Sequence, residues 1–279
     1  MELTNKTHYT VIMKLSMRVF NSIKMVVEKF SKVLNFGTLQ NKTGRKLAIN
    51  ITDIVTLGIY KQRFDIETKK GLYEMFDLKC SYKTLVVNLN RWSWIVMVIL
   101  TLIMKMNRQN QHLIKHIDST DIPVCSFKNA NKHKTMKGIA QFARTKKGTF
   151  FGLKLHLISD FKRNILRIRF TSGNVDDRTP VMGMSDEIWG LLIGDAGYVS
   201  KKLEKEFYQE HKRIFMSKPR KNMNKLATDF ELKLYDTRAL IELNFRSLKM
   251  FHGLVTSLPR SVAGYFANYI YSLLAYQLA

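Results

Sequence analysis

Apolar residues in the first third of the chain follow the spacing of amphipathic helices. Between residues 8 and 35 they recur every three or four positions, with basic residues between them. Thr52 and Asp53 have the residue types of an N-cap and a first-turn acid, and they predict a second helix that runs through Tyr60. Two further short helices are predicted, at residues 69–77 and 82–90. The pattern therefore predicts a helical N-terminal region.

One segment of this region is almost wholly apolar. It runs for 13 residues, from Trp92 to Met104, whereas a helix that spans a bilayer needs about 20. We therefore expect a buried helix or strand of the core here, and no membrane partner.

From about residue 113 the pattern changes to an alternation with a period of two, which is typical of strands with one buried face. The predicted elements in chain order are a strand that runs from His112 into Asp118, a hairpin of strands 152–158 and 165–170, a strand at 191–194, a helix at 199–211, a strand at 213–216 and a long helix at 229–249. A hairpin followed by crossover helices indicates an α/β fold, in which a mixed sheet of antiparallel and parallel strands is flanked by helices. We expect two domains, a helical region over residues 1–112 and a sheet domain over residues 113–279.

The charge of the chain favours a polyanionic partner. Its 279 residues include 46 Lys and Arg against 22 Asp and Glu, which gives a formal net charge of +24. Residues 1–117 hold 19 basic and 7 acidic residues and residues 118–279 hold 27 and 15, so each part nets +12. The basicity is therefore a property of the whole surface and not of a tail. Nucleic acid is favoured as the partner over an acidic membrane surface.

The cysteines and the N-terminus bear on the compartment. Cys80 and Cys125 form no CxxC pair and no even framework, which argues against a disulfide-stapled secreted fold and against a cysteine zinc site. The N-terminal residues lack the continuous apolar region and the cleavage site of a signal peptide. We expect a cytoplasmic protein.

Three carboxylates occupy positions that the predicted layout would bring together. Asp118 is expected at the end of the first strand, Asp195 follows strand 191–194, and Glu242 lies on the last helix. Sites in open α/β sheets form beyond the strand ends. Three clustered carboxylates are unfavourable without cations, whereas two Mg²⁺ ions bridged by them can activate water or a hydroxyl for attack on a phosphodiester. The alternative is three ordinary surface or capping acids, and the low acid content of the chain favours the metal site.

The last helix is predicted to carry a polar stripe beside an apolar one. Tyr235, Arg238, Glu242 and Lys249 fall within an arc of roughly 60° if the helix is continuous at about 100° per residue. An Arg, a Lys and a Tyr beside a metal-binding acid can hold phosphates. The alternative is a chance amphipathic helix with a mixed face.

A basic loop precedes this helix. It holds four basic residues and no acid: Lys218, Arg220, Lys221 and Lys225. Such a run alone is usually a solvated loop, but its position next to a candidate catalytic acid predicts contact with nucleic-acid phosphates.

Five further residues are weaker candidates for the same site. Lys154 and His156 alternate on strand 152–158 and could point toward it, although an outward orientation explains them about as well. Asp121, Asp176 and Asp177 could substitute for the assigned acids, but their predicted loop positions make them less suitable ligands.

The polar stripe resembles the signature of a known family. The pattern Tyr235-x2-Arg238-x3-Glu242-x6-Lys249 matches the Tyr-Arg-Glu-Lys signature of bacterial insertion-sequence transposases of the DDE class. The segments that resemble the motifs of the first acid, of the stretch before the second acid and of the second acid are Ile117–Thr120, Gly173–Asp177 and Gly194–Tyr198. The resemblance covers about residues 113–279 and is weaker in the helical N-terminus.

The resemblance implies a ribonuclease H-like catalytic domain over residues 113–279. It implies that the metal-binding catalytic triad is Asp118, Asp195 and Glu242, and that the accessory DNA contacts are Tyr235, Arg238 and Lys249. The implied reaction is cleavage and strand transfer at the ends of an insertion sequence, with two Mg²⁺ ions for which Mn²⁺ can substitute.

The resemblance also implies partners. They are double-stranded DNA, both element ends and target, and further copies of the chain in a dimer or larger multimer on that DNA, in the nucleoid region of a bacterial cytoplasm. For the helical region over residues 1–112 we expect DNA binding or dimerisation; it shows no clear helix-turn-helix signature, and a plain helical scaffold is the alternative. The alternatives are a ribonuclease H-like nuclease that only hydrolyses, and a catalytically silent DNA-binding remnant of a mobile element.

Overall fold

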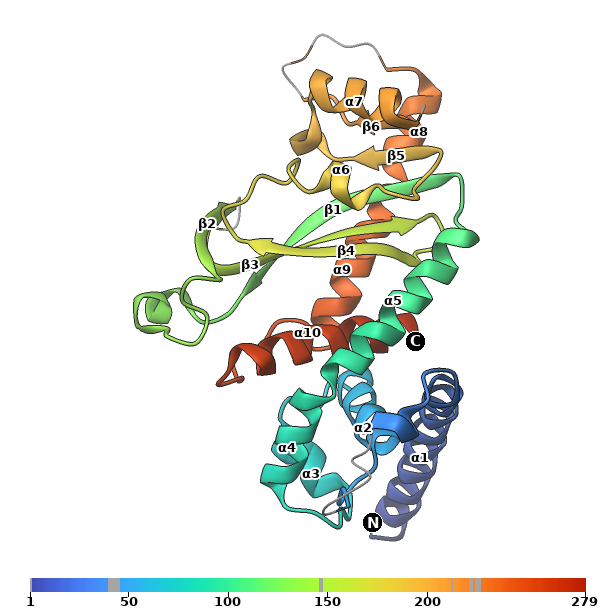
Figure 1. The fold of residues 1–279 in the computed structure, drawn as a ribbon, viewed down its shortest axis with the longest axis vertical. Coiled ribbons are helices and arrows are strands. Elements are labelled where there is room, and N and C mark those ends of the chain that lie inside the picture. Colours follow the sequence, from blue (N-terminus) through green and yellow to red (C-terminus); the bar gives the residue numbers. More distant parts are fainter. Residues whose placement is uncertain (1, 40–45, 146–147, 212, 221–222, 224–226) are drawn as a thin grey trace. The chain divides into compact units, whose positions relative to one another are not determined.

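The computed structural model divides the chain into two compact units (Figure 1). It describes residues 2–39, 46–145, 148–211, 213–220, 223 and 227–279. The helical unit consists of residues 1–100, 251–253 and 263–279, and the sheet unit consists of residues 101–250 and 254–262. The last helix therefore groups with the N-terminal helices, which differs from the predicted boundary between residues 112 and 113.

In the described part of the chain, the helical unit is built from five helices and from the first part of α5 (Ser93–Gln109), up to Leu100. The five helices are α1 (Glu2–Val33), α2 (Ile51–Arg63), α3 (Lys69–Met75), α4 (Tyr82–Arg91) and α10 (Val262–Gln277), and a short 3-10 turn η1 (Phe36–Leu39) follows α1. The predicted start of α2 is wrong. Asn50 is the N-cap and accepts a hydrogen bond from the backbone N–H of Asp53, so Thr52 lies inside the first turn.

The composition of α10 explains why it joins this unit. Tyr265, Tyr269 and Leu273 are fully buried, and a helix that is apolar on most sides must be covered on most sides. Helix α10 packs against α2 at Gly58, where an added Cβ would lie 2.1 Å from the ring of Tyr271. The close approach of α2 and α10 therefore requires glycine at this position.

The apolar run of the sequence forms part of α5 (Ser93–Gln109), which confirms the prediction of a buried element. Ile95, Val96, Ile99 and Leu100 are buried on it. Among the described residues no single helix is long and apolar enough to cross a membrane. Only α4 and α5 taken together, across a 40° bend, reach the length and composition of a span.

The sheet unit contains a six-stranded mixed sheet. Its strands are β1 (Ile114–Pro123), β2 (Gln141–Thr145), β3 (Gly148–Asp160), β4 (Ile165–Ser172), β5 (Leu191–Gly194) and β6 (Ile214–Ser217). The order is β4-β3-β1-β5-β6, with β2 beside the first part of β3. The β4, β3 and β1 pairs are antiparallel, whereas β1, β5 and β6 are parallel. This is the strand order of the ribonuclease H-like fold, as the sequence predicts.

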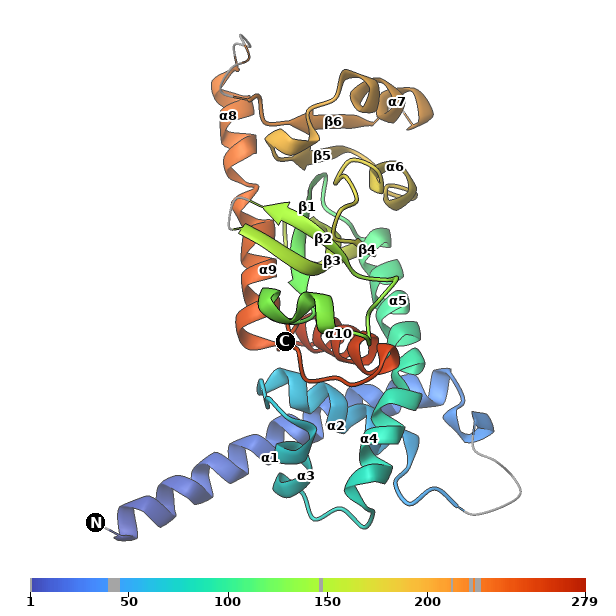
Figure 2. The same cartoon turned by 90° about the vertical axis from the view of Figure 1, so that its left-hand side faces the viewer.

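Helices cover both faces of this sheet (Figure 2). On one face α6 (Val181–Met184) and α7 (Lys201–His211) enclose a core that includes Ile117, Leu192 and Phe207. On the other face lie α8 (Asp229–Asp236) and α9 (Ala239–Phe251), and here Leu234 and Tyr235 pack with Ile193. The central strand β1 is thus buried between β3 and β5 along its edges and between helices on its faces.

Candidate active site

Asp118 lies in the interior of β1 and not at its end. The strand continues to Pro123 because residues 118–123 pair with β3, for example Asp118 with Leu157. The predicted strand end at Asp118 is therefore wrong: the polar residues that follow it are half-buried and keep their backbone in the ladder. The pairing with β3 fixes the position of the Asp118 backbone, whereas the pairing of β1 with β5 covers only Ile114–His116.

Asp195 comes directly after β5, as predicted. In the parallel pairing of β1 with β5, His116 lies opposite Ile193, and the same register continued by two residues brings Asp195 alongside Asp118. The Asp195 side chain accepts a hydrogen bond from the backbone N–H of Gly197 at 2.8 Å, which orients its carboxylate. The sheet therefore brings the first two acids together.

Glu242 is joined to the first acid through Arg238. The guanidinium of Arg238 donates a hydrogen bond to Asp118 Oδ2 at 2.8 Å, and its other terminal nitrogen donates to Glu242 Oε1. Asp118 and Arg238 have side chains that are 17% and 21% exposed, whereas Glu242 is 56% exposed. A cation thus already lies between Asp118 of the central strand and Glu242 of α9.

The predicted long helix is two helices, α8 and α9, which are separated at Thr237 and Arg238. The Thr237 hydroxyl donates to the carbonyl oxygen of Leu234 at 2.6 Å and also bonds Nε2 of buried His116 at 2.8 Å. The backbone N–H of Arg238 bonds the Tyr235 carbonyl oxygen three residues back, so the chain tightens at this point. The prediction of one continuous helix is therefore wrong, but Arg238 and Lys249 of the predicted arc both still bond acids of β1.

Tyr235 shows the effect of this break. It is 4% exposed and packs with Ile193 and Leu234 beneath the sheet, so the structure does not present it to DNA. Arg238, after the break, points to the acids instead.

The electrostatics of Asp118 are those of a crowded, desolvated acid. Burial raises its pKa to about 7; the Arg238 guanidinium counteracts this rise, and the charges of Asp195 and Asp177 add to it. The structure therefore holds acids close together in a place where their negative charge is costly, which is a property of sites that bind cations.

Residues 108–262 match the family model described as a transposase DDE domain. This match covers more than half of the chain and ends at Val262, the last residue of the sheet unit. The chain belongs to the DDE transposase family. It is a DNA transposase, an enzyme that cleaves phosphodiester bonds and transfers strands.

Solved structures with some likeness to this transposase are complexes of the Mos1 mariner transposase. A Mos1 paired-end complex with Mn is 12% identical, over 88% of this chain and 83% of that chain, with a TM-score of 0.27. A pre-cleavage Mos1 transpososome is 10% identical, over 85% and 80%, with a TM-score of 0.26. TM-scores this low do not support a fold assignment. The assignment of the ribonuclease H-like fold rests on the strand order. No curated protein matches the chain.

DDE transposases generally use divalent metal ions, and the donor set of this one suits them, because carboxylate oxygens are the ligands of Mg²⁺ and Mn²⁺. Within the described ranges, no three Asp, Glu, His or Cys side chains already form a ligand cluster. Instead, the Arg238 guanidinium bridges Asp118 and Glu242 and supplies the positive charge between them. The carboxylate oxygens of Asp118, Asp195 and Glu242 are of the type that binds such ions.

Asp177 is a further acid near Asp118, and the sequence made it only a weak candidate for the site. Asp177 Oδ1 accepts hydrogen bonds from Ser119 Oγ at 2.8 Å and from Lys154 Nζ at 2.9 Å. Lys154 therefore points toward the site, whereas buried His156 bonds the Thr171 hydroxyl and does not reach it. The signal in the sequence was the Gly173–Asp177 segment, but only the folded sheet brings it beside β1.

The remaining predicted contacts lie around this site. Lys249 Nζ donates to Asp121 Oδ1 at 3.1 Å, so Asp121 belongs to β1 and is the partner of a basic residue. Lys218 and Arg220 are exposed, and Arg220 Nε donates to the carbonyl oxygen of Ala196, the residue after Asp195. Lys221 and Lys225 lie outside the described residues.

Proposed function

We propose that this transposase cuts DNA at the ends of its own mobile element, and that Asp118, Asp195 and Glu242 hold the metal ions for the reaction. The observation that carries this proposal is the bridge from Asp118 through Arg238 to Glu242, with Asp195 in register beside Asp118. In this proposal a mid-strand acid of the central strand, an acid after the neighbouring parallel strand and an acid on a covering helix share one site.

The proposed metal ions are two Mg²⁺, for which Mn²⁺ can substitute. When bound, they supply charge neutralisation and activate water, or a DNA 3′-hydroxyl, for attack on the phosphodiester. Asp118, Asp195 and Glu242 would supply the carboxylate oxygens that hold these ions. Arg238, once released from the acids, is one turn away from Glu242 and can bind a DNA phosphate.

The proposed partner is double-stranded DNA, both the element ends and the target. Lys218 and Arg220 support this because they are exposed and lie beside the segment that carries Asp195. Lys249 is a further proposed phosphate contact, and Lys221 and Lys225 stay predictions. We include a dimer or larger multimer in the proposal, because an element has two ends that must be processed together.

The test is Asp118→Asn, assayed for cleavage and for DNA binding with the same element-end duplex. The change removes a metal ligand and no phosphate contact, so we expect cleavage to be lost and the binding affinity to change by less than about threefold. Asp229→Asn removes an exposed acid at the start of α8 and serves as the matched control, with activity retained. Full cleavage by Asp118→Asn would overturn the proposed site.

A further inference from the structure

Asp118 and Ser119 are consecutive residues of β1 whose side chains point to opposite faces of the sheet, as the alternation of a strand requires. Asp118 bonds Arg238, which lies between α8 and α9. Ser119 alternates with Ile117, which belongs to the core on the face of α6 and α7. A group that binds the Ser119 side chain can therefore act on Asp118 through the backbone that the two residues share.

The Ser119 side chain binds Asp177. Its hydroxyl donates to Asp177 Oδ1 at 2.8 Å, and Lys154 Nζ donates to the same oxygen at 2.9 Å and to the carbonyl oxygen of Val175 at 2.8 Å. The side chains of Lys154 and Asp177 are 17% and 35% exposed, so their charge-assisted bond is partly shielded from water. Lys154, Asp177 and Ser119 thus form a relay of hydrogen bonds from β3 to β1.

The segment that carries Asp177 is held against the sheet at Gly173. The Gly173 backbone N–H donates to the carbonyl oxygen of Gly152 at 3.1 Å. A Cβ added at Gly173 would lie 2.9 Å from the carbonyl oxygen of Gln141, so any side chain here would push the segment away from β2 and β3. The glycine therefore allows the close approach from which Asp177 reaches Ser119.

A buried tyrosine lies on the other side of Ser119. Tyr198 is 1% exposed, and its hydroxyl lies near that of Ser119 without a complete hydrogen bond to any described residue. Burial raises the pKa of Tyr198, and the charges of Asp118, Asp177 and Asp195 raise it further, so the phenol keeps its proton. Because Ser119 has one hydrogen to donate, a neighbouring donor directs that hydrogen to Asp177.

The relay reaches Asp118 through the main chain. The backbone N–H of Ser119 donates to Asp118 Oδ1 at 2.8 Å, whereas Oδ2 accepts from Arg238. One carboxylate oxygen is thus oriented by the strand itself. The position of that N–H depends on how Ser119 is anchored, and Asp177 supplies the anchor.

We propose that Asp177 is a positioning residue of the active site, which fixes the Asp118 carboxylate through Ser119. This inference rests on the proposed function, in which Asp118 holds metal ions. Asp177 Oδ1 is occupied by Ser119 and Lys154, and the Lys154 ammonium balances its charge. Groups that hydrogen-bond a metal-binding site orient its ligands, and their loss typically costs about 10- to 100-fold in metal affinity or activity.

The test compares Asp177→Ala, Asp177→Asn and Ser119→Ala. Mn²⁺ affinity of the free protein is measured by electron paramagnetic resonance, and cleavage and DNA affinity are measured with the element-end duplex. Asp177→Ala and Ser119→Ala should each lose about 10- to 100-fold in Mn²⁺ affinity or in cleavage rate, with unchanged DNA affinity. Asp177→Asn removes the same charge but keeps an oxygen acceptor for Ser119, so it should stay close to the wild type.

A double-mutant cycle tests whether the two side chains act along one path. Asp177→Ala combined with Ser119→Ala should cost no more than the more damaging single change. Asp186→Ala is the matched control, because it removes an acid whose side chain is 75% exposed, and it should keep full Mn²⁺ affinity and cleavage. Unfolding curves for all variants identify any that do not fold, and Ser119→Ala with Asp177→Asn keeps the test valid without Asp177→Ala.

Three outcomes would overturn the positioning role. Wild-type behaviour of Asp177→Ala and Ser119→Ala would show that the relay is not needed. An Asp177→Asn variant as damaged as Asp177→Ala would mean that Asp177 acts by its charge or as a metal ligand. A matching loss of DNA affinity would place Asp177 in DNA binding. Asp118→Asn in the same assays separates the two proposals: if it still cleaves, the proposed site itself fails, and if it alone is inactive, only the relay fails.

Discussion

Asp118 and Arg238 set the state of the active site before metal binds. The carboxyl of Asp118 lies near two other acids, Asp195 and Asp177, and bonds the guanidinium of Arg238. Arg238 lowers the pKa of Asp118, but burial outweighs it and the pKa stays raised. Two consequences at the level of single side chains can be measured without DNA.

The first consequence is that Asp118→Asn should stabilise the metal-free protein at neutral and basic pH. An Asp in the unfolded chain has a pKa of about 4, whereas Asp118 in the folded protein has a pKa of about 7. The folded state therefore retains a proton that the unfolded state has lost, and stability from this group falls as pH rises from about 4 to about 7. An asparagine side chain has no carboxyl proton to lose, so the stability of the variant lacks this contribution to the pH dependence. The Tm of the variant minus that of the wild type, measured in EDTA, should grow across this pH range. A constant difference would show that Asp118 is ionised throughout.

The second consequence is that metal ions compete with Arg238. Arg238→Gln removes the guanidinium from Asp118 and Glu242, so the acids should bind Mn²⁺ more tightly, by about three- to tenfold if the ion pairs are worth about 1 kcal/mol. Free Mn²⁺ measured by electron paramagnetic resonance gives the affinity directly. Arg246→Gln removes an exposed arginine from α9, the helix that carries Glu242, and should leave the affinity unchanged. Weaker Mn²⁺ binding by Arg238→Gln would mean that the guanidinium assists the metal site.

At the scale of elements, the sequence predicted those parts of the site that depend on local pattern. Strand β5 is short and apolar, so its end and the position of Asp195 were predictable. Asp118 was misplaced because the polar residues after it suggest a loop, and only pairing with β3 keeps them in the strand. Tyr235 was misassigned because the helix was taken as continuous. The break depends on Thr237 and His116, residues that are far apart in sequence, and no local pattern reveals it.

The break between α8 and α9 should be sensitive to the hydroxyl of Thr237. Thr237→Val keeps the shape but removes the bonds to His116 and to the Leu234 carbonyl oxygen. A buried imidazole nitrogen is then left without its partner, which costs about 1–3 kcal/mol. We expect a corresponding fall in the free energy of unfolding, measured by urea denaturation, and slower strand transfer because Arg238 follows directly. Thr237→Ser retains the hydroxyl and should stay close to the wild type. Equal stability of the Val and Ser variants would show that the Thr237 hydroxyl does not stabilise the break between α8 and α9.

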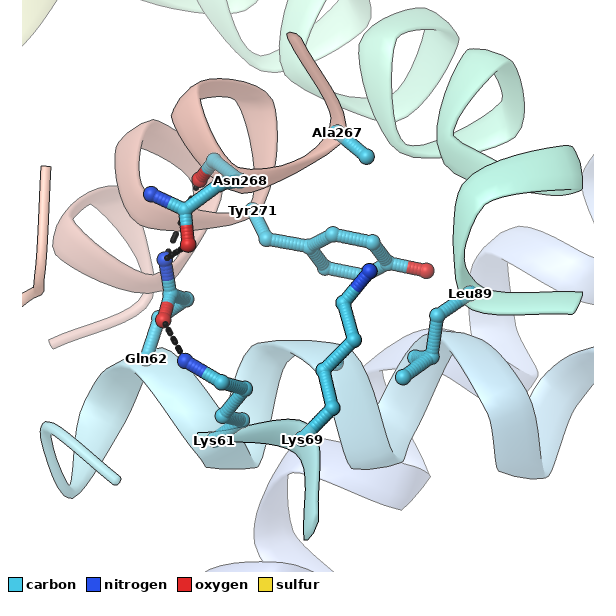
Figure 3. Close-up of a pocket in the computed structure, with 8 residues that line it drawn as sticks. Lys61, Gln62, Lys69, Leu89, Ala267, Asn268 and Tyr271 are labelled. Carbon is cyan, nitrogen blue, oxygen red and sulfur yellow. Dashed lines mark hydrogen bonds between the residues drawn. The ribbon is translucent and has the colours of Figure 1, made fainter. Parts of the chain in front are cut away.

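At the scale of the whole molecule, the division of the chain follows packing and not sequence order. The family match at residues 108–262 ends where the sheet unit ends, and α10 returns to the helices of the N-terminal region. The boundary between the two units lies between residues 100 and 101, inside α5, and the change of period near residue 113 does not mark it. The return of α10 was not predictable either, because it depends on the match between Gly58 of α2 and Tyr271 (Figure 3), which lie in distant segments.

The net charge of +24 acts on DNA from the whole surface, but particular residues should account for contacts at the active site. Neutralising Lys218 and Arg220 to Gln should reduce the slope of log affinity against log salt by about 0.9 for each lost phosphate contact. Lys201→Gln with Lys202→Gln removes the same charge from exposed positions of α7, and should lower the affinity slightly without this change in slope. Fluorescence anisotropy of a labelled duplex, titrated in EDTA at several NaCl concentrations, measures both. If the two double variants show the same slope, the loop acts only through net charge and does not contact the phosphates beside Asp195.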